Sequence, residues 1–223
     1  MKGQNFSFAL FKKIGYRGTS MEQHHYFLNV EHKDSDFFSF TDYFLDKPYT
    51  FKSCTDIFSK DCIDYGTSLL LKTVIKNIEL SGAVLDVGCG YGAIGILLKK
   101  YFENIDIDMI DINQTAVKLS QENAKLNGVV VNVFESNMYE NVHNKYTHIV
   151  TNPPIKAGKQ NLFSVITGGI EVLEDGGTIT LVIKKKHGME SLKNHMNQIF
   201  GNVEVLKKDK GYYILHSVKT KAN

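Results

Sequence analysis

Apolar and polar positions follow two different periods along this chain, and the period changes repeatedly after residue 65. Residues 65–78 carry apolar side chains at the spacing of one helix face. Beyond them, short apolar runs predict strands over 83–88, 105–112, 129–135, 147–152 and 177–185. Longer periodic segments predict helices over 92–102, 113–127, 162–175 and 189–200. Two short strands, over 203–208 and 211–219, close the pattern as a hairpin.

This alternation of strands and helices predicts an α/β fold with a mostly parallel sheet. Helices are expected on both faces, and the terminal hairpin forms an antiparallel edge. Asn113 is the expected N-cap of the helix over 113–127, and Gly128 lies just beyond its end.

The segment before residue 64 has a different pattern. Residues 37–44 and 49–54 read as two strands around a turn at Pro48, so a β-hairpin is expected there. Residues 1–20 show no periodic pattern, and we expect them to form a disordered extension, or to precede a true start at Met21. One domain is therefore expected over 21–223, with an N-terminal β segment over 21–63 and a catalytic core over 64–223.

Composition and charge narrow the class of protein. Apolar residues make up 43% of the 223 residues, and no run is long enough to cross a membrane. Three cysteines without metal-type spacing and eight scattered histidines predict a reducing cytoplasm and no metal site. The net charge of +2 is uneven, because residues 156–223 carry 11 lysines and only 6 acidic residues. Such a basic segment suits either phosphate binding or simple solvation.

A glycine-rich turn between a strand and a helix, "LDVGCGYGAIG" over 85–95, is the first candidate site. It fits a nicotinamide site, an S-adenosylmethionine site or a purely structural turn. Asp86 favours the second, because a carboxylate there repels a pyrophosphate and attracts an ammonium or sulfonium group. Gly88 and Gly90, with Cys89 between them, allow close approach to the backbone. Asp111 can accept hydrogen bonds from both ribose hydroxyls.

Residues around two neighbouring strand ends suit an adenine ring. Asn137 can accept a hydrogen bond from the adenine amino group, while Ile112 and Met138 can pack on the two faces of the ring. Ordinary loop residues are the alternative interpretation.

The segment "IVTNPPIKAGK" over 149–159 is the second candidate site. Pro153 and Pro154 fix φ and lack an N–H, and Pro153 keeps Asn152 out of the helical region. The strand therefore ends in a stiff rim with two acceptors, the Asn152 side-chain oxygen and the Pro153 carbonyl. Two acceptors suit the two hydrogens of a planar exocyclic amine, whose nitrogen they turn toward a methyl donor.

Together, "DVGCGYGAIG", "DIN" over 111–113, "NPPIKAGK" and "IFSKDCIDYGTSLLL" resemble the class I S-adenosylmethionine-dependent methyltransferases. The chain is most similar to the short, single-domain branch of the small-subunit ribosomal RNA methyltransferase C family, which methylates guanine N2. The resemblance implies a Rossmann-like, seven-stranded sheet. It also implies cofactor contacts from Asp86, the glycines and Asp111, with Asn152 to Pro154 at the target amine.

Several further residues are predicted to bind the substrate. Ile155 stands where many amine methyltransferases have an aromatic residue that stacks the target base. Lys156 and Lys159 can hold phosphates beside a flipped guanine, and Lys60 and the lysines over 184–186 can extend that track. We expect an RNA partner, 16S ribosomal RNA or the small subunit, with no membrane and no metal, and a homodimer as an option.

Other functions fit part of the pattern. A protein glutamine-N5 methyltransferase also uses "NPP", although Ile155 and the following lysines disfavour it. A non-catalytic RNA-binding or ribosome-assembly factor would keep the fold without the reaction. A DNA adenine methyltransferase is disfavoured because no segment of this chain is long enough for a separate target-recognition domain. A nicotinamide oxidoreductase is disfavoured because Asp86 would repel the pyrophosphate of its cofactor.

Overall fold

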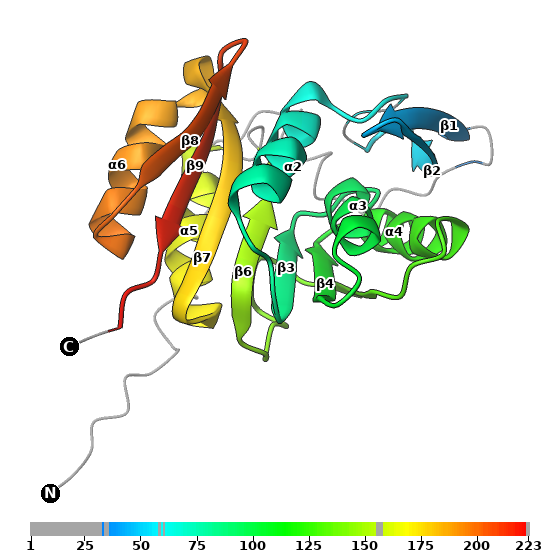
Figure 1. The fold of residues 1–223 in the computed structure, drawn as a ribbon. Helices are drawn as coiled ribbons and strands as arrows, with labels where there is room; N and C mark the ends of the chain where they lie inside the picture. Colours follow the sequence, from blue (N-terminus) through cyan, green and yellow to red (C-terminus); the bar gives the residue numbers. More distant parts are fainter. Residues whose placement is uncertain (1–32, 34–35, 58, 60, 155–157, 222–223) are drawn as a thin grey trace, which may run out of the picture.

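The computed structural model describes residues 33, 36–57, 59, 61–154 and 158–221, and it contains two sheets (Figure 1). The small sheet is the hairpin of β1 (Phe37–Phe44) and β2 (Lys47–Cys54). The large sheet has seven strands in the order β5-β4-β3-β6-β7-β9-β8. Its strands are β3 (Ala83–Val87), β4 (Asp106–Asp111), β5 (Asn132–Glu135), β6 (Tyr146–Thr151), β7 (Leu173–Lys184), β8 (Glu204–Asp209) and β9 (Tyr212–Val218).

Helices cover both faces of the large sheet, as the alternating pattern predicts (Figure 1). The helices are α2 (Tyr65–Asn77), α3 (Ala93–Tyr101), α4 (Gln114–Leu126), α5 (Lys159–Val172), the short 3-10 helix η4 (Lys185–His187) and α6 (Met189–Phe200). One apolar core lies between the sheet and α2, α3 and α4, and a second lies between the sheet and α5 and α6. The fold thus has three layers.

The strand directions confirm the predicted sheet. Strands β3, β4, β5, β6 and β7 pair in parallel, whereas β9 pairs antiparallel with both β7 and β8. Parallel strands point their carboxyl ends to the same edge, so the loops that follow β3, β4, β5 and β6 meet there.

The helix ends follow the local sequence signals. The Asn113 side chain accepts hydrogen bonds from the backbone N–H groups of Thr115 and Ala116, which confirms it as the N-cap of α4. Gly128 lies just past the end of α4 with φ of +62°. Such a left-handed residue ends a helix at little cost when it is glycine.

The turn of the first hairpin differs from the prediction. It is formed by Leu45 and Asp46, both at positive φ, and Pro48 pairs with Tyr43 inside β2 instead of marking the turn.

The boundary between α5 and β7 differs as well. The helix expected over 162–175 ends earlier, at Val172, and β7 begins at Leu173 rather than at 177. Leu173 is extended and pairs with Tyr146, and a bulge separates that pair from the one between His148 and Thr178. Pairing with β6 therefore overrides the helical pattern of the last residues of this segment.

A buried amide connects the β1–β2 hairpin to α4 and to the glycine-rich turn after β3. Asn123 on α4 has no exposed surface; its Oδ1 accepts from Lys52 N at 2.7 Å. Its Nδ2 donates to the backbone oxygens of Lys52 and Tyr91, each at 2.8 Å. One side chain thus connects β2, α4 and the glycine-rich turn that contains Tyr91.

Replacing Asn123 with alanine is expected to lower the free energy of unfolding by about 3 kcal/mol, because it leaves shielded backbone groups of Lys52 and Tyr91 without partners. Urea denaturation measures this loss. Asn132→Ala is the control, because that side chain is exposed on β5 and makes one hydrogen bond, to Asp108. An equal loss in both variants would contradict the role given to Asn123.

Candidate active site

Three strand ends are tied together at the carboxyl edge of the sheet. The Thr151 hydroxyl, at the end of β6, donates to the Val87 oxygen at the end of β3 at 2.7 Å. The Gly88 and Cys89 N–H groups donate to the Ile110 oxygen of β4 at 2.8 and 3.0 Å. The glycine-rich turn, the segment after β4 and the segment that begins at Asn152 are therefore neighbours.

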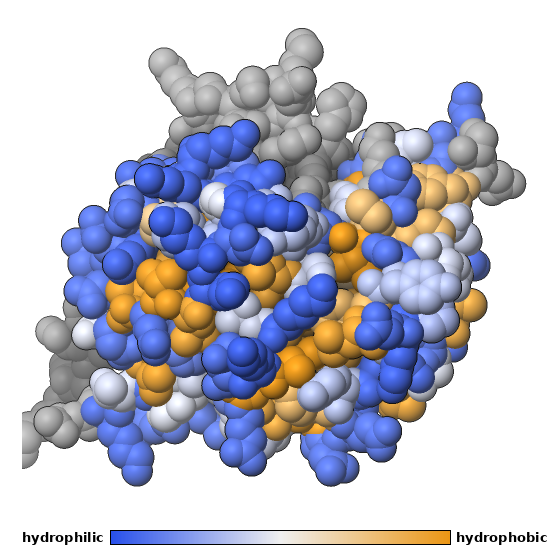
Figure 2. All heavy atoms as spheres, turned by 45° about the horizontal axis from the view of Figure 1, so that its top comes forward, coloured by the Kyte–Doolittle hydropathy of each residue, from blue (hydrophilic) through white to orange (hydrophobic). Residues whose placement is uncertain are grey.

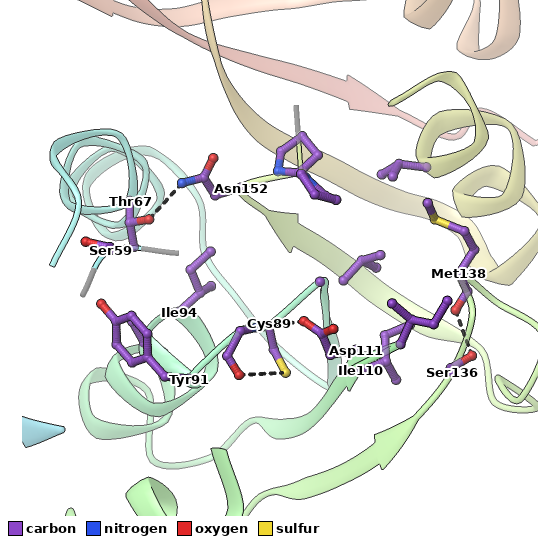
Figure 3. A pocket seen from close by; sticks show the side chains of 18 of the residues that line it. Ser59, Thr67, Cys89, Tyr91, Ile94, Ile110, Asp111, Ser136, Met138 and Asn152 are labelled. Carbon is purple, nitrogen blue, oxygen red and sulfur yellow. Dashed lines mark hydrogen bonds between the residues drawn. The ribbon is translucent and has the colours of Figure 1, made fainter. Parts of the chain in front are cut away.

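These segments enclose a cavity of about 330 Å³, a volume within the usual range for a small-molecule site (Figure 3). Its wall comes from eight separate parts of the chain and unites both candidate sites of the sequence. The lining residues are Ser59, Thr67, Val87, Gly88, Cys89, Gly90, Tyr91, Ala93, Ile94, Ile110, Asp111, Ile112, Ser136, Asn137, Met138, Asn152, Pro153, Pro154, Val165 and His187.

The glycine-rich turn forms the floor of this cavity. Gly88 and Gly90 have φ values of +73° and +58°, a region that favours glycine. A Cβ on Gly88 would lie 3.5 Å from Pro154 Cδ, so the turn faces the proline rim across a narrow space. Cys89 also lines the cavity, and burial raises the pKa of its thiol well above the usual value. Because Gly88 and Gly90 have no side chains, a ligand in the cavity can approach this backbone closely.

Asp111 holds the turn in place from the end of β4. Its Oδ2 accepts from Gly90 N and its Oδ1 from Asn113 N, both at 2.9 Å. Burial raises the pKa of this carboxyl, and the backbone N–H groups that it accepts from act in the opposite direction. Each carboxylate oxygen keeps a lone pair. Asp111 can therefore accept further hydrogen bonds from a ligand in the cavity.

The predicted adenine residues lie together on the wall beside Asp111. Ile112, Asn137 and Met138 all line the cavity. The Asn137 Nδ2 donates to Glu140 Oε1 at 3.1 Å, which leaves the amide oxygen as its acceptor. The Ser136 hydroxyl donates to the Met138 backbone oxygen at 2.7 Å and holds Met138 at a φ of +50°. This arrangement fits a ring between two apolar side chains with one amide at its edge.

Asp86 lies behind the cavity wall rather than on it. It is fully buried in β3, and its Oδ2 accepts from Gly95 N, in the first turn of α3, at 3.2 Å. Its Oδ1 has no partner within the described part of the chain. Burial raises the pKa of the Asp86 carboxyl to about 8, and the charge of Asp111 adds to this effect. A buried acid without a full set of partners fits a site completed by a cationic ligand.

The amide of Asn152 has a fixed orientation. Its Nδ2 donates to Thr67 Oγ1 at 2.9 Å and lies 3.5 Å from Asp64 Oδ2 (Figure 3). A carboxylate only accepts hydrogen bonds, so the amide nitrogen is the atom that faces Asp64. Asp64 is itself fixed, because it is the N-cap of α2 and accepts from Gly66 N at 2.8 Å. The Asn152 oxygen therefore remains as the acceptor for a substrate.

Of the predicted substrate-binding residues, Lys159 is described, and it does not line this cavity. Lys159 begins α5, and its Nζ lies 5.2 Å from the centre of the Phe163 ring. Lys60, Ile155 and Lys156 lie outside the described residues. The lining contains Pro153 and Pro154, as predicted for the rim.

Half of the lining residues were not predicted from the sequence, and Ser59, Thr67, Tyr91 and His187 are among them. Tyr91 belongs to the glycine-rich turn itself, and Thr67 follows the helix N-cap Asp64, so both carried a local signal. Ser59 and His187 come from the loop before α2 and from η4, and only the fold brings them to the cavity. In Figure 3, Ser59, Thr67 and Tyr91 lie on the side opposite Ser136 and Met138.

Comparison with known proteins decides the family. The model of the methyltransferase small domain family matches residues 48–216. The chain belongs to this family. It is therefore an S-adenosylmethionine-dependent methyltransferase, and it is similar to the ribosomal RNA small subunit methyltransferases C.

Individual relatives of this methyltransferase differ in length. The uncharacterized protein YbxB of Bacillus subtilis is 41% identical over 176 residues, which cover 78% of this chain and 87% of that one. The ribosomal RNA small subunit methyltransferase C of Colwellia psychrerythraea is 33% identical over 193 residues, 81% of this chain and 52% of that one. The chain thus spans about half the length of the methyltransferase C relatives that it matches.

A solved structure shows the same fold. The Thermus thermophilus 16S rRNA N2 G1207 methyltransferase, in complex with AdoMet and guanosine, superposes with a TM-score of 0.74 at 24% identity. The match covers 82% of this chain and 50% of that one. The Rossmann-like methyltransferase fold and its S-adenosylmethionine cofactor thereby agree with the prediction from the sequence.

The described residues contain neither a candidate membrane span nor a candidate metal cluster. None of their helices is long and apolar enough to span a bilayer, and none of their His, Cys, Asp and Glu side chains cluster as a metal site would require.

The buried Asp86 predicts a pH-dependent stability. In the unfolded chain its pKa returns to the ordinary value of 3.8, whereas burial in the fold raises the pKa to about 8. Between these values only the unfolded state loses the proton, so the free energy of unfolding falls as pH rises, by about 1.4 kcal/mol per pH unit. Asp86→Asn should remove this slope between about pH 5 and 7.

Chemical denaturation of the ligand-free protein across that range measures the slope. Asp106→Asn, at an exposed position at the start of β4, controls for the loss of one negative charge. A wild-type slope retained in Asp86→Asn would show that Asp86 is ionised in the fold.

Proposed function

We propose that this methyltransferase acts on an exocyclic amine, and specifically on guanine N2 of 16S ribosomal RNA. The observation that carries the proposal is the orientation of Asn152, whose amide nitrogen is held by Thr67 and Asp64. Its oxygen is left as an acceptor on the rim of the cavity that also contains Asp111 and the glycine-rich turn.

The rim suits an amine because it offers acceptors, and the proposed reaction needs no strong base. The Asn152 oxygen and the Pro153 carbonyl accept the two amine hydrogens in this proposal. Holding both hydrogens opposes delocalisation of the nitrogen lone pair into the ring and directs it toward the methyl donor. The same two dipoles stabilise the positive charge that develops on the amine during transfer. The methylated amine then loses a proton readily, so solvent can take it.

The rest of the wall is assigned to the cofactor. S-adenosylmethionine supplies, when bound, a methyl group on a positively charged sulfur. Asp111 accepts from the ribose hydroxyls, Asn137 accepts from the adenine amine, and Ile112 and Met138 hold the ring between them. Asp86 lies behind the glycine-rich turn, where its unpartnered oxygen favours a positively charged ligand.

Named relatives support the choice of substrate. Several relatives are ribosomal RNA small subunit methyltransferases C, and about half of the length of each aligns with this chain. The superposed Thermus thermophilus enzyme is described in complex with guanosine. The guanine N2 named for that enzyme is an exocyclic amine, the type of group that suits the two acceptors of the Asn152 rim.

Two substitutions should separate binding from chemistry. Asn152→Ala should lower kcat roughly a hundredfold, as expected for loss of a preorganised polar group, and leave cofactor affinity nearly unchanged. Asp111→Ala should instead weaken cofactor binding by about 1.5–3 kcal/mol, because charge-assisted hydrogen bonds are lost. Calorimetry with S-adenosylhomocysteine and single-turnover methyl transfer measure the two effects. Wild-type turnover in Asn152→Ala would exclude the amine platform.

The substrate itself is identified with radiolabelled S-adenosylmethionine, offered in parallel assays with naked 16S ribosomal RNA, small ribosomal subunits and total cell protein. We expect the label in RNA, released on digestion as N2-methylguanosine. Label in a glutamine of a protein would replace this proposal with the amide alternative. Absence of label in every sample, with cofactor binding shown by calorimetry, would favour a non-catalytic assembly factor.

Thr67 is expected to position Asn152 rather than to touch the substrate. Thr67→Val keeps the shape of the side chain but removes the 2.9 Å partner of the amide nitrogen. The amide can then rotate, and kcat should fall roughly tenfold to a hundredfold, because small misplacements near a reacting group are costly. Thr67→Ser keeps the hydroxyl and should retain most of the activity.

Thr73→Val is the matched control for Thr67. This buried threonine lies in the same helix, and its hydroxyl donates to the Leu69 oxygen at 2.7 Å. Its kcat should stay close to wild type. If Thr67→Val and Thr73→Val lose the same activity, the loss reflects the packing of α2 and not the orientation of Asn152.

A further inference from the structure

A row of polar side chains crosses three strands at the carboxyl edge of the sheet, next to the cavity. In the strand pairing, Tyr212 of β9 stands opposite both Lys184 of β7 and Asp209 of β8. Tyr65, the first residue of α2, packs on Tyr212 with ring centres 5.4 Å apart and donates its hydroxyl hydrogen to the Asp209 carboxylate. These three strand ends and the start of α2 therefore share one surface.

Two aromatic rings hold lysines on this surface. Lys184 Nζ lies 4.6 Å from the centre of the Tyr212 ring, and Lys210 Nζ lies 4.7 Å from the centre of the Tyr65 ring. Such cation–π contacts restrict a flexible ammonium without neutralising its charge. Lys210 occupies the turn between β8 and β9, which stands with the start of α2 at the upper edge of Figure 1.

Three more lysines extend the surface. The strand pairing places Lys207 opposite Ile214, whose side chain belongs to the core under α2, so Lys207 is on the same side of the sheet. Lys185 and Lys186 are exposed in η4, and Lys185 N donates to the Gly211 oxygen at 2.8 Å, which ties η4 to the β8–β9 turn. We call this set the lysine face; its members are Lys184, Lys185, Lys186, Lys207 and Lys210.

The charge of the lysine face is largely uncompensated. Among the described residues, no carboxylate lies within ion-pair distance of any of the five lysines. Asp209 is an acid within this surface. The hydrogen bond from Tyr65 is the main cause that lowers the pKa of its carboxyl. The ionised Asp209 offsets part of the five positive charges, and the Asp64 carboxylate also interacts with Lys184 electrostatically. The left side of Figure 2, where α6, β8 and β9 lie, is mostly hydrophilic with one apolar cluster.

The lysine face leads directly into the cavity. His187 follows Lys186 in η4 and lines the cavity wall. Tyr212 packs closely on Gly66, where a Cβ would lie 2.7 Å from the Tyr212 ring, and the next residue, Thr67, also lines the cavity. A polymer whose reacting unit enters the cavity therefore passes over these lysines on one side.

We propose that the lysine face binds backbone phosphates of the RNA strand that flanks the target nucleotide. This inference rests on the proposed RNA methyltransferase function. Separate ammonium groups on flexible stems suit a regularly charged polyanion, and the only arginine of the chain is Arg17, so forked recognition of single bases is not available here. The two tyrosines already carry lysines on their faces, so their role is to place charge and not to read bases.

Neutralising two of these lysines tests the proposal. Lys184→Gln combined with Lys210→Gln should raise the Kd for a labelled single-stranded RNA of the target region roughly tenfold at about 0.1 M salt. The slope of log Kd against log salt concentration should fall by about 1.4, since each lost phosphate contact contributes about 0.7 on a single strand. Fluorescence anisotropy in the presence of S-adenosylhomocysteine measures both without any methyl transfer.

Matched variants separate position from charge. Lys118→Gln combined with Lys125→Gln removes the same charge from exposed positions on α4 and should change Kd less than twofold. Lys184→Arg combined with Lys210→Arg should restore binding. Equal losses in the two glutamine pairs, or wild-type binding in the first, would overturn the proposal.

A second ligand distinguishes RNA from an acidic protein. Polyglutamate of similar net charge should bind the wild-type chain more weakly than the RNA does. Equal binding of both would overturn the assignment to RNA. The failure of the proposed function gives a different result, namely salt-dependent RNA binding through the lysine face without N2-methylguanosine in the methyl-transfer assay.

Discussion

The shared edge of the parallel strands is the constraint on which the site depends. Hydrogen bonds from Thr151 to Val87, and from Gly88 to the Ile110 oxygen, fix the ends of β6, β3 and β4 against one another. Lining residues that are distant in the sequence, at 88–90, 111–112 and 152–154, form one wall of the cavity through these bonds. The chemistry therefore needs few residues, because the sheet supplies their mutual placement.

Buried polar side chains connect this edge to the surrounding elements. Asn123 joins the hairpin to the glycine-rich turn, and Asp64 connects the start of α2 to Asn152. Asp86 differs from both, because one of its oxygens has no partner among the described residues and burial raises its pKa to about 8. A buried acid of this kind costs stability in the empty protein and favours a cationic ligand beside it. The site thus trades some stability of the ligand-free fold for affinity.

Sequence periodicity predicted the sheet and its helices well because each element carries its own signal. The N-cap Asn113 and the glycine after α4 marked helix ends by local backbone chemistry. The start of β7 was misplaced, since pairing of Leu173 with Tyr146 is a contact between strands that no local pattern encodes. The same reason explains the site. Asp111 and Asn152 follow strands and were found, whereas Ser59 and His187 reach the cavity only through the tertiary fold.

The orientation of Asn152 bears on which reaction the site performs. An amide whose nitrogen faced the cavity would donate to its substrate and would suit a carbonyl or an anion. Here the Asp64 carboxylate and the Thr67 hydroxyl hold the nitrogen, so the rim presents oxygen instead. An oxygen acceptor matches a group that carries hydrogens and gains positive charge, as an amine does during methylation. In the proposed reaction, part of the selection of the nucleophile therefore lies in α2, a helix that precedes the whole parallel sheet in sequence.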